Sequence, residues 1–176
     1  MGGGKPLRLL DGRPLVDHAL ASARRWSGCI AVCVRQPDQI GAVGVPVITD
    51  APGIAGPLAG LAAALDWAAS QNCDRVLVVP CDMPFLPGDL ASRLAGALTS
   101  GAGVAIPVSG GHEHPICGVW RTSARPALEA QVAAGRLSLR GLAARVGQIT
   151  VSWPCGPRDP FANLNTPAEL AEAEAG

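Results

Sequence analysis

The sequence predicts an α/β protein in which short apolar strands alternate with amphipathic helices. Valine-rich apolar runs at residues 29–34, 45–49 and 76–79 are typical of strands in a parallel sheet. Segments with helical apolar spacing, residues 15–26 and 57–69, precede the first run and follow the second. We therefore expect a Rossmann-like three-layer α/β fold, with a mostly parallel sheet, helices on both faces and a late antiparallel hairpin.

The hairpin is predicted by two apolar runs, residues 103–108 and 115–120, on either side of the turn Ser109-Gly110-Gly111. The first helix is expected to begin at Pro14, after the Asp11-Gly12 turn, and a further helix is expected from Pro87 onward. Residues 122–134 and 138–146 also have helical spacing, and residues 148–153 form the last expected strand. Helices and strands thus alternate along most of the chain.

The chain of 176 residues has the length of one domain, which we assign to residues 1–176. Its 14 basic and 14 acidic residues cancel, so charge gives no reason to expect binding to nucleic acid or to a membrane surface. No apolar run is long enough to span a bilayer and no signal-peptide pattern is present, so we expect a cytoplasmic protein. The scattered cysteines predict reduced thiols rather than a disulfide framework or a zinc knuckle: Cys29, Cys33, Cys73, Cys81, Cys117 and Cys155.

The strand at residues 76–79 is expected to be buried on both faces, and Asp82 follows it directly. In open α/β sheets, ligands bind beyond the carboxyl ends of the strands. A carboxylate at that place is a hard oxygen ligand, suited to Mg²⁺ and through the metal to phosphates. The alternative is a turn aspartate that accepts hydrogen bonds from its own backbone. Asp50 is a second carboxylate at the end of a predicted strand.

Two glycine-containing segments could approach an anion. Gly2, Gly3 and Gly4 precede Lys5, which offers a point charge to phosphates; a flexible terminus with one lysine is the alternative. The segment is not a complete P-loop, because no strand precedes it and no Ser or Thr follows the lysine. The loop at residues 51–56 leads into a helix N-terminus, which presents backbone N–H groups and a positive dipole end; a tight strand-to-helix connection is the alternative.

Two polar groups near the end of the chain have alternative interpretations. The His112-x-His114 pair could chelate zinc, but no third ligand follows by spacing, so histidines in a polar turn are the preferred interpretation. Thr166, with Glu169 three residues later, forms the capping box of a last helix. Asn163 and Asn165, just before this helix, could bond the local backbone or project amides into a ligand site.

The order and spacing of six motifs resemble those of the molybdenum cofactor guanylyltransferase family: MGGGKPL, Asp50, GPLAGL, VLVVPCDMPFL, EHPICGVW and FANLNTPAEL. The resemblance covers essentially the whole chain, and its wider superfamily is the sugar-nucleotide pyrophosphorylase-like nucleotidyltransferases. It implies a nucleotidyltransferase fold and transfer of GMP from GTP to molybdopterin, with release of pyrophosphate and dependence on Mg²⁺. Molybdoenzyme apoproteins or their chaperones are implied as possible further partners.

The resemblance also implies roles for individual residues. Lys5 and Asp82 correspond to catalytic positions, and Asp82 is the expected Mg²⁺ ligand. Lys5, Asp50, Asp82 and Arg35 are expected to bind the nucleotide, although the family often has asparagine at the position of Arg35. Asn163, Asn165 and Arg136 are expected on the pterin side. No nucleophilic side chain is expected, because in-line transfer to phosphorus depends on positioning and charge neutralisation.

The family has a strand and an L-A-G-G-x-S-x-R segment before the methionine that corresponds to Met1. We therefore expect the domain to be N-terminally incomplete, with unpaired backbone groups on the neighbouring strands and with activity restored by an upstream extension. Two other functions remain open: a sister enzyme that uses CTP with the same pterin, and a non-catalytic domain that binds and delivers the cofactor.

Overall fold

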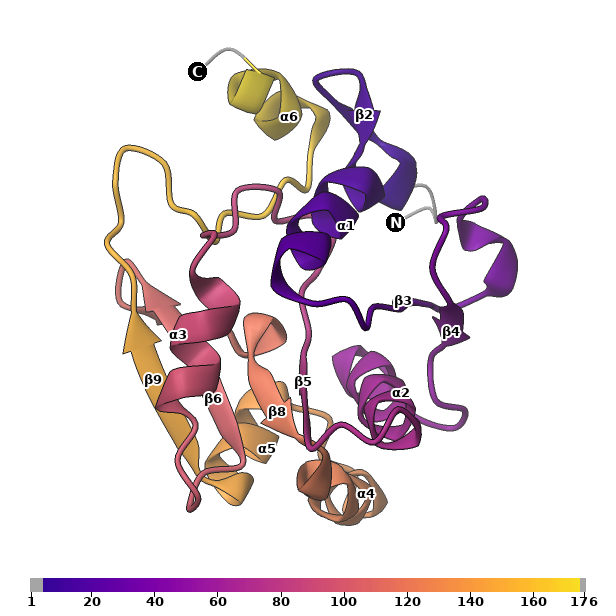
Figure 1. Cartoon of the computed structure of the whole chain (residues 1–176), viewed down its shortest axis with the longest axis vertical. Coiled ribbons are helices and arrows are strands. Elements are labelled where there is room, and N and C mark those ends of the chain that lie inside the picture. Colours follow the sequence, from indigo (N-terminus) through magenta and orange to yellow (C-terminus); the bar gives the residue numbers. More distant parts are fainter. Residues whose placement is uncertain (1–4, 175–176) are drawn as a thin grey trace.

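The structure is a computed structural model that describes residues 5–174, apart from the side chains of Lys5 and Pro167 (Figure 1). The helices of this part of the chain are α1 (Leu15–Trp26), α2 (Pro57–Ser70), α3 (Leu90–Ala97), α4 (Arg125–Ala133), α5 (Leu139–Val146) and α6 (Pro167–Glu174). Its strands are β1 (Leu9–Leu10), β2 (Arg13–Pro14), β3 (Val32–Val34), β4 (Val47–Thr49), β5 (Arg75–Leu77), β6 (Val104–Ser109), β7 (His112–Glu113), β8 (Val119–Arg121) and β9 (Gln148–Ser152).

The largest sheet is mixed, so the expectation of a mostly parallel sheet is wrong. Strand β8 lies between β5 and β6 and is antiparallel to both, β7 is antiparallel to β6, and β9 is parallel to β6. The cause is the reversal at Gly110 and Gly111, whose φ angles of 53° and 79° are in the left-handed region that glycine adopts without strain. The returning chain forms a 3₁₀ turn, Pro115–Cys117, and becomes strand again only at Val119.

Strands β3 and β4 form a separate parallel pair, as the sequence predicts for neighbouring strands of this fold class. Within the described residues, β5 has ladder partners only on β8. Val76, Leu77 and Val78 are half-buried. Both faces of this strand contact a core, since Val76 packs against one cluster and Leu77 against the other, but the side chains are half-buried rather than fully buried as expected.

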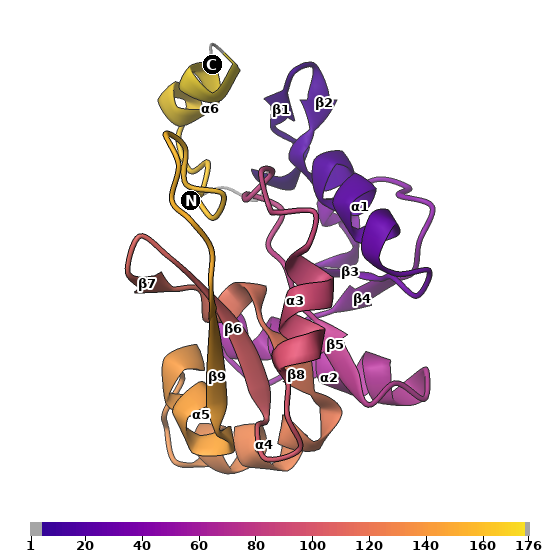
Figure 2. The same cartoon turned by 60° about the vertical axis from the view of Figure 1, so that its left-hand side comes forward.

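Helices cover both faces of the mixed sheet, which confirms the layered α/β arrangement (Figures 1 and 2). The alternation of side chains along the strands separates two cores. Val104, Ile106 and Trp120 pack against α2, α4 and α5, while Ala105 and Val119 face α3 with Trp153. A third, smaller cluster joins Leu10 and Leu15 to the C-terminal helix α6.

Most of the predicted helices are present, with small shifts at their ends. Pro14 is the N-cap of α1 rather than its first residue, and α3 begins at Leu90, three residues after Pro87. The capping box of α6 is confirmed: the Glu169 backbone N–H donates to Thr166 Oγ1 at 3.2 Å and the Thr166 N–H to Glu169 Oε2 at 2.9 Å. None of the helices within residues 5–174 is long and apolar enough to cross a membrane.

Candidate functional site

The parallel pairing of β3 and β4 brings Arg35 and Asp50 to the same edge. Val34 is opposite Thr49, and the Asp50 backbone N–H donates to the Val34 carbonyl at 2.9 Å. Arg35 is exposed and its backbone N–H is bound by Gln39 Oε1 at 2.8 Å, while Asp50 is half-buried. The structure thus places two of the expected nucleotide-binding residues side by side.

The Asp50 carboxylate has a neighbour that the sequence analysis left without a role. Cys33 Sγ lies 3.3 Å from Asp50 Oδ1 and donates a hydrogen bond to it. Cys33 is an exposed residue, but the pKa of its thiol is raised to about 12, chiefly by partial removal of the thiol from water and further because Asp50 accepts its hydrogen bond and carries negative charge. Only the pairing of β3 with β4 brings this thiol to the carboxylate.

The loop after Asp50 folds back onto the start of α2. The Ala51 backbone N–H donates to the Ala59 carbonyl, and Gly53 and Gly56 have φ angles of 75° and 70°, which allow the tight path. Gly56 is the N-cap of α2 and Pro57 its first residue. The helix N-terminus thus lies next to the carboxylate, although its affinity for an anion stays a prediction.

Asp82 lies on the C-terminal side of β5, where three distant segments meet. The Leu164 backbone N–H donates to the Asp82 carbonyl at 2.8 Å, which fixes the loop carrying Asn163 and Asn165 against it. Cys117 is also close: burial raises the pKa of its thiol, and the charge of Asp82 raises it further. The structure therefore places Asp82 beside the loop that carries the two asparagines, and their roles in one site stay a prediction.

The loop of the two asparagines is held from both sides. The Arg8 Nη1 donates to the Asn165 carbonyl at 2.8 Å, and the Asn165 backbone N–H donates to Glu169 Oε2 at 2.6 Å. Asn163 and Asn165 are both exposed at this place. Beside the loop lies a cavity of about 260 Å³, lined by Phe85, Pro157, Arg158, Leu164, Glu169, Glu172 and Ala173.

Two other expected residues, Arg136 and Lys5, are not joined to these groups by the hydrogen bonds that the structure describes within residues 5–174. Arg136 is exposed in the loop between α4 and α5, where its backbone N–H donates to the Gln131 carbonyl at 3.0 Å. Lys5 begins a short 3₁₀ turn, Lys5–Leu7, but its side chain lies outside the described residues, as do Gly2, Gly3 and Gly4. The roles of Lys5 and Arg136 therefore stay predictions.

His114 supports the asparagine loop, a role that the sequence analysis missed. Its Nε2 lies 2.9 Å from the hydroxyl of the buried Ser109, and its ring stacks on Phe161 with the centroids 4.9 Å apart. The pKa of His114 is lowered chiefly by burial, and also by His112 and Arg140, against the opposing charge of Asp159. This role is identified only by the contact of His114 with Phe161, which lies far along the chain.

The donor chemistry fits Mg²⁺ better than zinc. No three His, Cys, Asp or Glu side chains between residues 5 and 174 cluster as a ready-made metal site, so the zinc alternative for His112 and His114 has no support. Mg²⁺ needs no such cage, because it is usually held by one or two carboxylates together with substrate phosphates and waters. Asp82 meets that requirement.

A family model and curated relatives place the chain in the same family. The model of the family described as "MobA-like NTP transferase domain" matches residues 1–149. A molybdenum cofactor guanylyltransferase from Bradyrhizobium sp. (strain ORS 278) is 41% identical over 99% of the chain and 85% of its own length. One from Acidiphilium cryptum (strain JF-5) is 38% identical over 99% and 87%.

Solved structures share the fold. A molybdopterin-guanine dinucleotide biosynthesis protein A from Archaeoglobus fulgidus superposes with a TM-score of 0.75 at 23% identity, covering 97% of this chain and 89% of its own. A 2-C-methyl-D-erythritol 4-phosphate cytidylyltransferase from Thermus thermophilus gives a TM-score of 0.71 at 22% identity, covering 99% and 94%. These likenesses, at such identities, establish the fold alone.

Proposed function

Because the chain belongs to the MobA-like NTP transferase domain family, we propose that it transfers GMP from GTP to molybdopterin and releases pyrophosphate. The observation that carries this proposal is the 41% identity, across nearly the whole chain, to a relative named molybdenum cofactor guanylyltransferase. The motifs that prompted the same expectation from the sequence lie throughout the aligned length. The substrates would be GTP and molybdopterin, and the product would pass to molybdoenzyme apoproteins or their chaperones in the cytoplasm.

The chemistry is a displacement at phosphorus. A phosphate oxygen of molybdopterin forms a bond to the α-phosphorus of GTP as the bond from that phosphorus to the β-phosphate oxygen breaks, and pyrophosphate carries away the electron pair. Such a reaction requires alignment and neutralisation of charge, and no nucleophilic side chain. This requirement agrees with a site built from carboxylates, amides and cationic side chains.

On the phosphate side, Asp82 would hold Mg²⁺ and Lys5 would add a second positive charge. When bound, the metal supplies charge neutralisation to the triphosphate. Asp82 is suited to this because its backbone is held by Leu164 and its carboxylate follows β5. On the nucleoside side, the adjacent Arg35 and Asp50 would bind the remainder of GTP.

On the acceptor side, Asn163 and Asn165 would contact molybdopterin, with Arg136 as a further cationic contact. The Arg8 and Glu169 hydrogen bonds hold the backbone of the asparagine loop, so the two amides need little further ordering on binding. The link from Leu164 to Asp82 supports a common site, because it keeps the acceptor loop beside the phosphate-binding residue.

The test is an assay of pyrophosphate release from GTP or CTP, with Mg²⁺ and molybdopterin. We expect release from GTP that depends on both the metal and the pterin. Release from CTP in place of GTP would instead make the protein a cytidylyltransferase. Binding of molybdopterin without pyrophosphate release from either nucleotide would overturn catalysis and favour a cofactor-delivery protein.

A further inference from the structure

The Asp50 carboxylate is held between a thiol and a helix. Cys33 Sγ donates to Oδ1 at 3.3 Å from the neighbouring strand β3. Helix α2 packs against the same pair at Gly60, where an added Cβ would stand 3.4 Å from Oδ1 and 3.9 Å from the sulfur. The absence of a side chain at residue 60 thus lets the helix approach the Cys33–Asp50 pair closely.

The two carboxylate oxygens of Asp50 differ as a consequence. Oδ1 already accepts the thiol hydrogen bond, whereas none of the side chains that the structure describes donates to Oδ2. A carboxylate at neutral pH only accepts hydrogen bonds, so Oδ2 needs a donor as its partner. The triphosphate of a nucleotide carries like charge and offers no donor, which leaves the hydroxyl or amino groups of the nucleoside.

The thiol keeps its proton under ordinary conditions. Partial removal of the thiol from water, the hydrogen bond and the negative charge of Asp50 together raise the pKa of Cys33 to about 12. Cys33 is therefore an S–H donor at neutral pH, and a weak nucleophile.

We propose that Cys33 is a positioning residue that fixes the Asp50 carboxylate so that Oδ2 accepts a hydrogen bond from the nucleoside of GTP. The donor is either a ribose hydroxyl or the amino group of guanine. The inference rests on the proposed function, since it names the group that this carboxylate recognises. Cys33 itself does not touch the nucleotide.

The first experiment measures GTP binding by titration calorimetry and steady-state kinetics in Cys33→Ala and Cys33→Ser. The alanine variant loses the donor, and we expect its Kd and KM for GTP to rise about tenfold with kcat nearly unchanged. The serine variant keeps a donor and should stay within about threefold of the unaltered protein. Cys155→Ala, at an exposed cysteine away from this carboxylate, is the matched control and should change nothing.

A double-mutant cycle isolates the pair. In an Asp50→Ala background, which has no side-chain oxygen to accept from the thiol, Cys33→Ala should weaken GTP binding by less than about twofold. Full additivity of the two substitutions, or a serine variant as weak as the alanine variant, would overturn the positioning role.

Two analogues identify the donor. The effect of Cys33→Ala should disappear with 2′,3′-dideoxyGTP, which lacks both ribose hydroxyls, if a ribose hydroxyl is bound, or with ITP, which lacks the 2-amino group, if guanine is bound. If the effect of Cys33→Ala persists with both analogues, the inference is overturned.

A further readout needs no nucleotide. Alkylation of Cys33, followed by mass spectrometry, should be faster in Asp50→Asn because the carboxylate that raises the thiol pKa is gone. If alkylation is faster in Asp50→Asn but the unaltered protein does not bind GTP, the proposed function and the nucleoside contact are both refuted, while the hydrogen bond between Cys33 and Asp50 is supported. If alkylation is unchanged in Asp50→Asn and the unaltered protein binds GTP, only the positioning role of Cys33 is refuted.

Discussion

At the scale of single residues, Asp82 is the carboxylate on which the proposed chemistry depends most. It is half-buried after β5, and its carbonyl binds the loop of the two asparagines. The hydrogen bond from Leu164 uses the backbone, so it is independent of the carboxylate. A side-chain substitution can therefore remove the metal ligand without releasing the loop.

We predict that Asp82→Asn lowers the rate of pyrophosphate release from GTP by at least about a hundredfold, because the amide is a poor substitute for an anionic Mg²⁺ ligand. The assay is pyrophosphate release at saturating Mg²⁺, with thermal unfolding as a check of the fold. Asp66→Asn is the control, since Asp66 is an exposed carboxylate on α2 that pairs with Arg125 of α4. Activity of Asp82→Asn within about tenfold of the unaltered protein would contradict the metal role.

His114 makes stability depend on pH. Its pKa is lowered in the folded protein, chiefly by burial, so the unfolded chain binds the proton more readily. The stability that neutral His114 contributes to the folded state is fully present above the pKa of the unfolded chain, about 6.5. This stability is lost as the pH falls through the lower pKa of the folded protein.

We predict that the free energy of unfolding falls as pH is lowered from about 7 to 5, and that His114→Gln makes this fall shallower. Glutamine keeps a polar partner for Ser109 but does not titrate near neutrality. The measurement is urea unfolding across this pH range, with His18→Gln as the control for a histidine bound elsewhere, to the Leu10 carbonyl. Equal slopes for His114→Gln and the unaltered protein would exclude His114 as the source.

At the scale of secondary-structure elements, the turn from α5 into β9 packs on the start of β6. The Gly103 backbone N–H donates to the carbonyls of Val146 and Gly147, both at 2.9 Å. A Cβ at residue 103 would stand 2.6 Å from the Val146 Cβ and 2.7 Å from its carbonyl oxygen. Backbone atoms cannot move aside as a flexible side chain does, so the close approach requires glycine.

We predict that Gly103→Ala lowers the free energy of unfolding by about 1–3 kcal/mol, because the added methyl group overpacks this junction. Gly101→Ala is the matched control, since a Cβ there meets no atom within 4 Å. Both are measured by chemical denaturation. A Gly103→Ala protein as stable as the Gly101→Ala protein would show that the junction relaxes freely.

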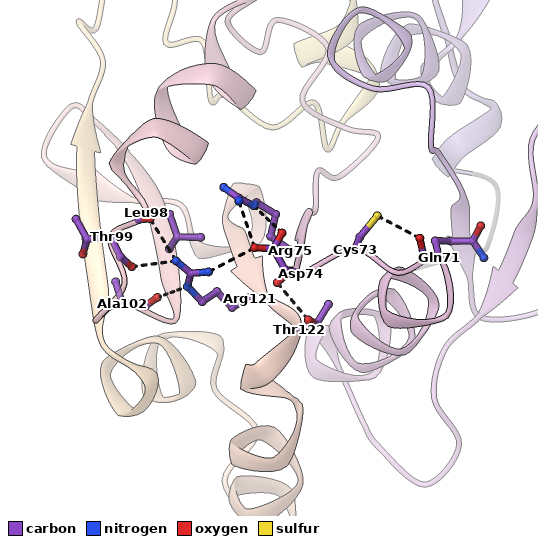
Figure 3. A network of polar contacts seen from close by, with 9 residues as sticks. All are labelled: Gln71, Cys73, Asp74, Arg75, Leu98, Thr99, Ala102, Arg121 and Thr122. Carbon is purple, nitrogen blue, oxygen red and sulfur yellow. Dashed lines mark hydrogen bonds and ion pairs between the residues drawn. The ribbon is translucent and has the colours of Figure 1, made fainter.

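At the scale of the whole molecule, a polar network ties the sheet to the helical layer around the start of β5 (Figure 3). Arg121, at the end of β8, donates to the carbonyls of Ala102 at 3.0 Å and Thr99 at 3.1 Å. It also pairs with Asp74, whose carbonyl accepts hydrogen bonds from Thr122. The network therefore joins the start of β5, the end of β8 and the connection from α3 to β6.

We predict that Arg121→Met lowers the free energy of unfolding by about 1–3 kcal/mol, because carbonyl groups bound by a partly buried cation lose their donor. GTP binding at 25 °C should stay within about twofold, since the network precedes β5 whereas Asp82 follows it. Arg75→Met is the control: Arg75 pairs with Asp74 at the surface, with 43% of its side chain exposed against 24% for Arg121, and should cost less than about 1 kcal/mol. An Arg121→Met protein no less stable than Arg75→Met would contradict the structural role.

The sequence by itself determined the alternation of strands and helices, the position of Asp50 and Asp82 after strands, and the capping box that begins α6. Each depends on residues within a few positions of one another, so apolar periodicity and cap chemistry were sufficient. The family motifs extended this to a substrate class and to the residues now proposed to bind it.

Only the tertiary structure decided which segments lie side by side. The insertion of β8 between β5 and β6, the half-burial of β5, the thiol on Asp50 and the histidine on Phe161 all join residues that are well separated along the chain. Local patterns specify which residues prefer to be strand or buried, but not which distant segment supplies the partner. That choice is made by the free energy of packing the whole chain, where the cost of closing each loop is balanced against the surface that the pairing buries.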